Sequence, residues 1–195
     1  GVIPLSFSTC EYKVSSDAGF PTTESVLGLN ANAPSGCMGW VGHDLPGGFG
    51  WLDHDATCLV ELDANNWADT DTGVGAGNDC KSIIESYVGK VIAFPIFDCL
   101  DANKINCAGE LPNGTHSYYH IKGWAAFQLT GVEIASIKAF DPVLHNKSTE
   151  SACKKGPDKL KKCVFGWFLP NWSASQGSID WTATDFGVDV VQVGG

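Results

Sequence analysis

The sequence contains no arginine, so all twelve of its basic residues are lysines. Without a guanidinium group, the chain has no planar fork that binds a phosphate or carboxylate through two parallel hydrogen bonds. Its formal net charge is −10, and this excess of acid disfavours contact with nucleic acids and anionic membrane surfaces. We therefore expect no nucleic acid among its partners.

Long apolar runs are also lacking. No stretch approaches the ~20 apolar residues that a membrane-spanning helix needs. The opening "GVIPLSFSTC" does not show the basic segment and apolar run of a signal peptide. We interpret residues 1–195 as a single extracellular, cell-surface domain whose export or anchoring segment is missing from the sequence. Contact with a membrane is then expected only through that missing N-terminal segment.

The common catalytic motifs are missing as well. The sequence has no G-x-S-x-G, H-E-x-x-H, Walker loop or G-x-G-x-x-G. A glycosidase needs two carboxylates about 5–10 Å apart, but with 22 acidic residues some pair meets that spacing in almost any fold. A secreted hydrolase is therefore an alternative without specific support, and we predict that the protein is not an enzyme.

Cysteine is abundant, but no C-x-x-C pair occurs among the eight cysteines. Zinc knuckles and thioredoxin-type redox sites both need such closely spaced pairs. The stretch "CLDANKINC" is therefore predicted to be a loop closed by a Cys99–Cys107 disulfide, rather than a metal site or a redox dithiol. Cys153 and Cys163 form a second short-range pair.

The remaining four cysteines allow three connectivities. We favour Cys37–Cys58, because these two flank one glycine-rich loop, and this choice leaves Cys10–Cys80. Persistent disulfides form in oxidising compartments. The cysteines therefore predict a location outside the cytosol.

Hydrophobic patterning predicts a β-rich chain. Residues 90–98 are apolar on both alternating faces, which is typical of a fully buried strand, and Pro95 implies a bulge or an edge position. Residues 117–140 contain a long half-buried strand that forms a hairpin with residues 90–98. Further strands are expected within residues 1–8, 24–30, 58–62, 162–170 and 186–193.

One helix is predicted near residues 79–88. Asn78 or Asp79 is a suitable N-cap, the apolar residues of "CKSIIESYVG" share one helical face, and Gly89 can supply the left-handed C-cap. The expected fold class is mainly β (α+β): a single disulfide-stapled antiparallel β domain with this one short helix and long loops.

Two acidic clusters are candidates for calcium binding. Asp53 and Asp55 alternate in "WLDHD", and Asp69 and Asp71 alternate in "ADTDTG" ahead of a glycine. Oxygen ligands at alternate positions before a glycine suit Ca²⁺, although the full twelve-residue EF-hand pattern is absent. Aspartate is also common in turns for backbone reasons. No other cofactor or metal is expected.

Lysine is concentrated in residues 147–162, which hold half of all the lysines. This segment is either a solvated loop or a patch that docks an acidic partner. The docking hypothesis involves five of these lysines: Lys154, Lys155, Lys159, Lys161 and Lys162.

Seven tryptophans offer a different surface chemistry. Exposed indole rings stack against sugars, but tryptophan serves equally well in cores and interfaces. Core or interface packing is the favoured interpretation. A secreted carbohydrate-binding module, with a glycan as partner, is the alternative function.

Several segments in order resemble one protein family. They include "IPLSFSTCEY" at 3–12, "PGGFGWLDHDATC" at 46–58, "GNDCKSIIESYVGKVIAFPIFD" at 77–98, "YYHIKGWAAFQLTGVEI" at 118–134, "CVFGWFLP" at 163–170 and the closing "DFGVDVVQV". Together they resemble the extracellular part of Flp-pilus (tight-adherence) assembly proteins of the TadE/TadG-like type. The lack of arginine, the "CLDANKINC" loop and the lysine-rich segment depart from the family pattern.

The resemblance implies a function as well as a fold. It implies a transmembrane helix before this domain and no catalytic residues. The expected function is that of a minor pilin-like structural or assembly protein. Such a protein acts through contacts with other pilus or cell-surface proteins, or through adhesion.

Overall fold

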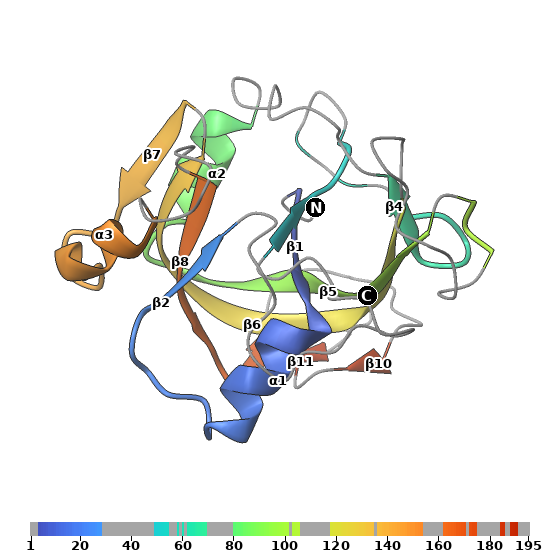
Figure 1. Ribbon diagram of the computed structural model, residues 1–195, viewed down its shortest axis with the longest axis horizontal. Helices are drawn as coiled ribbons and strands as arrows, with labels where there is room; N and C mark the ends of the chain where they lie inside the picture. The colour runs from blue at the N-terminus through green and yellow to red at the C-terminus, as the bar shows by residue number, and fades with distance from the viewer. Residues whose placement is uncertain are drawn as a thin grey trace, which may run out of the picture.

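The computed structural model describes residues 4–28, 49–54, 58, 60, 62–69, 80–101, 103–105, 118–134, 136–153, 162–170, 172–174, 184–185 and 188–190. In these residues the strands form one nine-stranded and one two-stranded sheet, accompanied by a few short helices (Figure 1). The predicted class, a β-rich disulfide-stapled fold, is confirmed.

The longest strand, β6 (Tyr118–Ile134), forms the centre of the large sheet. It pairs antiparallel with β5 (Val91–Asp101) along one edge and with β8 (Lys162–Phe168) along the other. The predicted hairpin is therefore confirmed. Three short strands pair with the remaining parts of β6: β4 (Trp67–Asp69), β7 (Ile137–Phe140) and β10 (Thr184–Asp185).

The outer strands come from the N-terminal part of the chain. β1 (Leu5–Ser8) lies beside β5 and runs parallel to it, and β10 is also parallel to β6. The sheet is thus mixed rather than purely antiparallel, since the long connection between β1 and β5 allows a parallel crossover. The remaining strands are β2 (Ser25–Gly28) beside β8, β3 (Phe49–Trp51) beside β1, and the parallel pair β9 (Trp172–Ala174) and β11 (Val188–Val190).

Most of the expected strands are found. β1, β2, β8 and β11 fall within the predicted ranges. The strand expected at 58–62 is wrong, because Cys58, Val60 and Leu62 have no strand pairing. Residues 59 and 61 lie outside the described residues.

Pro95 lies inside β5, directly before an irregular stretch. Its position is opposite Trp124, and the β5–β6 register shifts on both sides of Phe97. Proline has no N–H to donate to a neighbouring strand. Pairing with β1 begins one residue later, at Ile96, so Pro95 sits where β5 has no second neighbour. The register is regular at Pro95 itself, so the irregularity of β5 lies beyond the proline, at Phe97 and Asp98.

Two helices flank the sheet. The predicted helix is α2 (Lys81–Tyr87), and Gly89 follows it with a φ of 86°. Its N-cap is Cys80 rather than Asn78 or Asp79. A helix that was not predicted, α1 (Thr9–Asp17), follows β1 directly.

The start of α1 carries a recognisable sequence signal. The backbone N–H of Glu11 donates to Ser8 Oγ at 3.2 Å. Serine followed three residues later by glutamate is the capping-box pattern. The remaining short helices are a 3₁₀ turn, η3 (Lys147–Thr149), and α3 (Glu150–Cys153).

Apolar side chains cover both faces of the sheet. Ala125 and Ala126 are consecutive on β6 but belong to different core clusters, as expected for side chains that alternate between faces. The first cluster contains Phe7, and the second contains Tyr119, whose pKa is raised by burial. β6 therefore follows the predicted half-buried pattern only over Tyr118–Lys122 and is buried on both faces beyond it.

No helix within the described ranges has the length and hydrophobicity that crossing a membrane requires.

Candidate functional site

A pair of irregularities in the β5–β6 ladder brings charged side chains together. Phe97 is opposite Ile121, Ile96 is opposite Gly123 and Cys99 is opposite His120, so the register skips Asp98 and Lys122. An extra residue of this kind bends the strand and re-aims nearby side chains, and bulges occur often beside active sites. We call Asp98, His120 and Lys122 the bulge cluster.

Asp98 is the centre of the bulge cluster. Its Oδ1 lies 2.7 Å from His120 Nδ1, and its Oδ2 accepts a hydrogen bond from Lys122 Nζ at 3.3 Å. The Trp67 ring packs against the imidazole with centroids 4.9 Å apart. The Asp98 and His120 side chains are partly buried, so solvent reaches the cluster.

An aspartate–histidine pair is also found in catalytic triads. There the carboxylate orients the ring, so that the other nitrogen can take a proton from a nucleophile. In the described part of the chain, Asp98 is the only group that is hydrogen-bonded to the His120 ring. The adjacent Cys99 is in a disulfide and offers no thiol. The geometry therefore supports an ion network that fixes the bulge rather than a nucleophilic site.

A second network lies at the other end of β6, around Glu24. This carboxylate accepts hydrogen bonds from the hydroxyls of Thr130 and Thr149 and from the backbone N–H of Asn146. Its Oε2 also lies 3.0 Å from His145 Nδ1. Because both ionisable side chains are almost completely buried, these contacts replace the water that would otherwise solvate the carboxylate.

The His145 ring is enclosed on all sides. Its Nε2 lies 3.3 Å from Glu150 Oε1. Phe140 stacks on it with centroids 4.1 Å apart, and Phe165 meets it edge-on at 5.2 Å. We call Glu24, His145 and Glu150 the clasp, because they tie together the residue before β2, the turn after β7 and α3.

A third charged group, Asp63, organises the loop before β4. Burial, the largest single influence, acts to raise its pKa, but hydrogen bonds outweigh it and the net pKa is lowered. The donors are the backbone N–H groups of Trp67 and Asn65 and the Lys104 ammonium, which is 3.0 Å away. Lys104 also lies over the Tyr118 ring. Asp63 thus joins this loop to the end of the β5–β6 hairpin.

The disulfides confirm one predicted pair and correct others. Cys153 and Cys163 are bonded as predicted. Cys58 is bonded to Cys80, with Cα atoms 5.3 Å apart, so the favoured pairings Cys37–Cys58 and Cys10–Cys80 are wrong. The position of Cys37 and Cys58 on either side of a glycine-rich loop did not predict the partner of Cys58. That partner depends on where α2 packs, because Cys58 and Cys80 both belong to the core cluster.

The other predicted disulfides extend beyond the described residues. Cys10 and Cys99 are each in a disulfide, while Cys37 and Cys107 lie outside the described ranges. The Cys99–Cys107 staple therefore stays a prediction. Every cysteine that the structure describes is oxidised, which indicates a compartment outside the cytosol.

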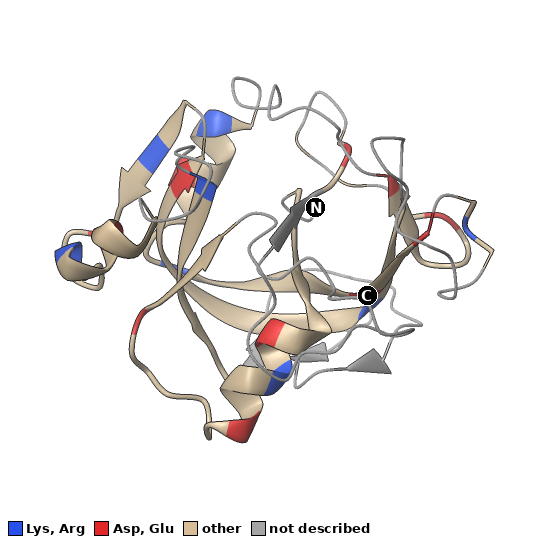
Figure 2. Cartoon of the chain, viewed as in Figure 1, with Lys and Arg blue, Asp and Glu red and all other residues tan. Residues whose placement is uncertain are grey.

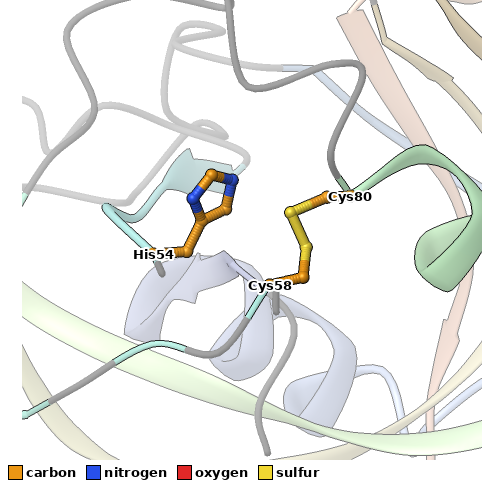
Figure 3. Close-up of side chains that lie close together, drawn as sticks. All are labelled: His54, Cys58 and Cys80. Atoms are coloured by element: carbon orange, nitrogen blue, oxygen red, sulfur yellow. A yellow bond between two sulfur atoms is a disulfide. The ribbon is translucent and has the colours of Figure 1, made fainter. Parts of the chain in front are cut away.

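Two cysteine-containing groups have the spacing of metal ligands. His54 lies beside the Cys58–Cys80 bond (Figure 3), and the ligand atoms of these three residues fall within 4.8 Å of one another. The same holds for Asp98, Cys99 and His120. Metal binding by cysteine requires a thiolate. Because these sulfurs are in disulfides, neither group is a metal site in the oxidised protein.

The calcium candidates are only partly described. The backbone N–H of Asp53 donates to the Asp69 carbonyl at 2.9 Å, so the structure brings the two segments together. The Oδ1 of Asp53 accepts the next backbone N–H in the chain, as turn aspartates do. Asp55 and Asp71 lie outside the described residues, and calcium binding stays a prediction.

The predicted lysine patch also falls mostly outside the described residues. Lys162 opens β8, whereas Lys154, Lys155, Lys159 and Lys161 are not described. The docking hypothesis for these lysines is therefore untested.

Tryptophan side chains with a described position are largely internal. Trp67 and Trp124 are buried, and Trp167 is half-buried. The first two cannot stack on a sugar, which agrees with the preference for core packing. Trp40 and Trp181 lie outside the described residues, and so do the side chains of Trp51 and Trp172.

Sequence reasoning missed both networks on β6. Asp98 and His120 are 22 residues apart, and Glu24 and His145 are 121 residues apart. No local spacing pattern links residues at such separations. Comparison with known proteins adds no further assignment, since no family model, curated protein or solved structure matches the chain.

Proposed function

We propose that this chain is the extracellular domain of a TadE/TadG-like protein. In this proposal it is a non-catalytic component of a surface pilus that acts through protein–protein contacts. The observation that carries the proposal is the oxidation of every described cysteine. Disulfides of this density are typical of domains that face the outside of a cell.

The two charged networks support a structural role. The clasp and the bulge cluster consist of residue types used in catalysis, yet each side chain is engaged in holding segments together. The clasp is the buried one of the two, and buried polar networks whose groups are satisfied rigidify a fold. A rigid scaffold suits a subunit or assembly factor that must present one surface to its partners.

The test is deletion of the gene in the organism of origin, with surface filaments counted by electron microscopy. We expect filaments to be lost or shortened and to return with the wild-type gene. Complementation with Lys13→Ala is the control, because Lys13 forms a solvent-exposed pair with Asp17 on α1, and such pairs contribute little to stability. Filaments of unchanged number, length and composition in the deletion strain would overturn the proposal.

Immunogold labelling of the wild-type protein then separates the roles within the proposal. Label along the filament identifies a shaft subunit, label at the end identifies a tip adhesin, and label at the base identifies an assembly factor.

A further inference from the structure

Two exposed apolar residues stand on a turn next to the clasp. Val143 is 86% exposed and Leu144 is 38% exposed, which makes them unusual among the large apolar side chains of the described residues. The turn is held firmly, because the Asp141 carboxylate accepts from the backbone N–H groups of Val143 and Leu144 at 2.9 and 2.7 Å. The following residue, His145, is fixed by the clasp.

Two lysines flank this turn. Lys138 on β7 and Lys147 on η3 both have exposed side chains, and Lys138 also pairs with the buried Glu133 at 3.5 Å. Among the other neighbouring carboxylates, Glu24 is buried, Glu150 is 22% exposed and contacts His145, and Asp141 caps the turn. We call Lys138, Val143, Leu144 and Lys147 the lysine pole. Its tip is apolar, and Lys147 is the exposed charge beside the tip for which no ion pair is found among the described residues.

A complementary surface lies at the opposite end of the sheet. Ile105 is 76% exposed beyond the end of β5. Asp69 pairs with Tyr118 at the start of β6, and Asp53 is bonded to the backbone of Asp69. Lys104 is turned toward Asp63. We call Asp53, Asp69 and Ile105 the acidic pole.

β6 sets the distance between the two poles. β4 pairs with Tyr118–His120, whereas β7 pairs with Gly131–Ile134 at the other end of the same strand. At about 3.3 Å per residue, these positions are roughly 40 Å apart. Figure 2 shows the blue lysines of β7 and of the segment entering α3 at one end of the long axis, and red on β4 at the other.

We propose that the lysine pole of one molecule docks on the acidic pole of a second copy of this chain. The apolar tip Val143–Leu144 would pack against Ile105, and Lys147 would face Asp53. Such a contact joins different surfaces of two identical molecules, so it repeats from one molecule to the next and generates a filament unless the rotation between copies closes it into a ring. This inference rests on the proposed function and names a second copy as the partner.

The test uses sedimentation velocity of the purified wild-type chain, from about 10 µM to about 1 mM, a range suited to small, weak interfaces. We expect the weight-average sedimentation coefficient to rise with concentration. The rise should weaken in about 0.5 M salt, because exposed charges are screened there. A wild-type chain that stays monomeric throughout would overturn the inference, while the filament phenotype of the deletion strain tests the proposed function separately.

Matched substitutions locate the contact. Val143→Ser should weaken association about tenfold, as expected for one buried valine side chain. Val14→Ser, at an exposed valine on α1, should leave association unchanged. Equal effects of the two substitutions would overturn the inference. Far-UV circular dichroism and the melting temperature should be the same for both, since neither side chain belongs to the core.

A charge exchange tests the pairing of the poles. Lys147→Glu and Asp53→Lys should each abolish association alone, because each places like charges across the contact. An equimolar mixture of the two variants should associate again, since the carboxylate introduced in one variant then faces the ammonium group introduced in the other. Lys13→Glu is the control for a charge change elsewhere. Failure of the mixture to associate would exclude this contact.

Discussion

Glu24 and His145 are 121 residues apart in the sequence, and their Oε2 and Nδ1 atoms lie 3.0 Å apart in the fold. Both side chains are almost completely buried, so their polar atoms depend on protein partners instead of water. The pair connects the residue before β2 to the turn after β7. The stability of the fold is therefore expected to depend on it.

Glu24→Ala should destabilise the protein by about 1–3 kcal/mol, the usual cost of leaving a buried hydrogen-bonding group without its partner. The substitution also removes the carboxylate to which the hydroxyls of Thr130 and Thr149 donate hydrogen bonds. Urea unfolding followed by tryptophan fluorescence measures the effect. Lys13→Ala, in an exposed pair, should change the unfolding free energy by less than about 1 kcal/mol. A similar loss of unfolding free energy in both variants would contradict the stabilising role assigned to the clasp.

The Cys58–Cys80 disulfide should contribute more to the unfolding free energy than the Cys153–Cys163 disulfide. The sequence separations are 22 and 10, and the loop-entropy model gives about 3.4 and about 2.7 kcal/mol, respectively. The first pair also lies within the core. Guanidinium unfolding of the two double serine variants measures the difference. A larger loss for the 153–163 pair would contradict this order.

Asp63 should make stability dependent on pH in the acid range. Its pKa in the folded protein is below the ordinary value of 3.8. The stability that it contributes is therefore present above its unfolded pKa and is lost as the pH falls through the folded pKa. The wild type should exceed Asp63→Asn in unfolding free energy by a constant amount above about pH 5, and this excess should shrink toward lower pH.

Unfolding curves of both proteins at several pH values provide the measurement for Asp63. Asp17→Asn on α1 is the control, because Asp17 is solvent-exposed and its pair with Lys13 contributes little. An excess that grows as the pH falls would have the wrong sign and would contradict the prediction.

Gly166 should tolerate no side chain. Its φ is 152°, and an added Cβ would overlap the Gln128 carbonyl oxygen and the Phe127 ring on β6. Gly166→Ala should therefore lower the unfolding free energy by more than the roughly 1 kcal/mol that is typical of a point substitution. Gly19→Ala, also at positive φ but with open space around it, separates backbone strain from overlap. Thermal unfolding measures both variants. A melting temperature that is lower for Gly19→Ala than for Gly166→Ala would contradict this prediction.

Much of the sheet could be predicted because its signals are local. The apolar run of residues 90–98 and the alternation within residues 117–140 predicted the central hairpin, whereas the bulge in β5 lies beyond Pro95. Helix α1 was missed although Ser8 and Glu11 form a capping-box pattern. That signal was present in the sequence.

The rest depends on contacts between distant segments. The parallel pairing of β1 with β5 and the partner of Cys58 follow from how the layers pack. The bulge cluster arises from a register shift that moves Asp98 and Lys122 out of the ladder. Alternation within one strand cannot reveal such a shift, since it depends on the opposing strand.

The strand order also constrains how the chain folds. β2 pairs with β8, and β1 pairs with β5 as well as with the nearer β3. The edges of the large sheet are therefore completed by segments that lie far apart in the sequence. Pairing of this non-local kind is slow, and strands that lack their neighbours expose unpaired edges in the meantime. The late pairing of β2 with β8 is thus the step at which this fold is most open to association with other chains.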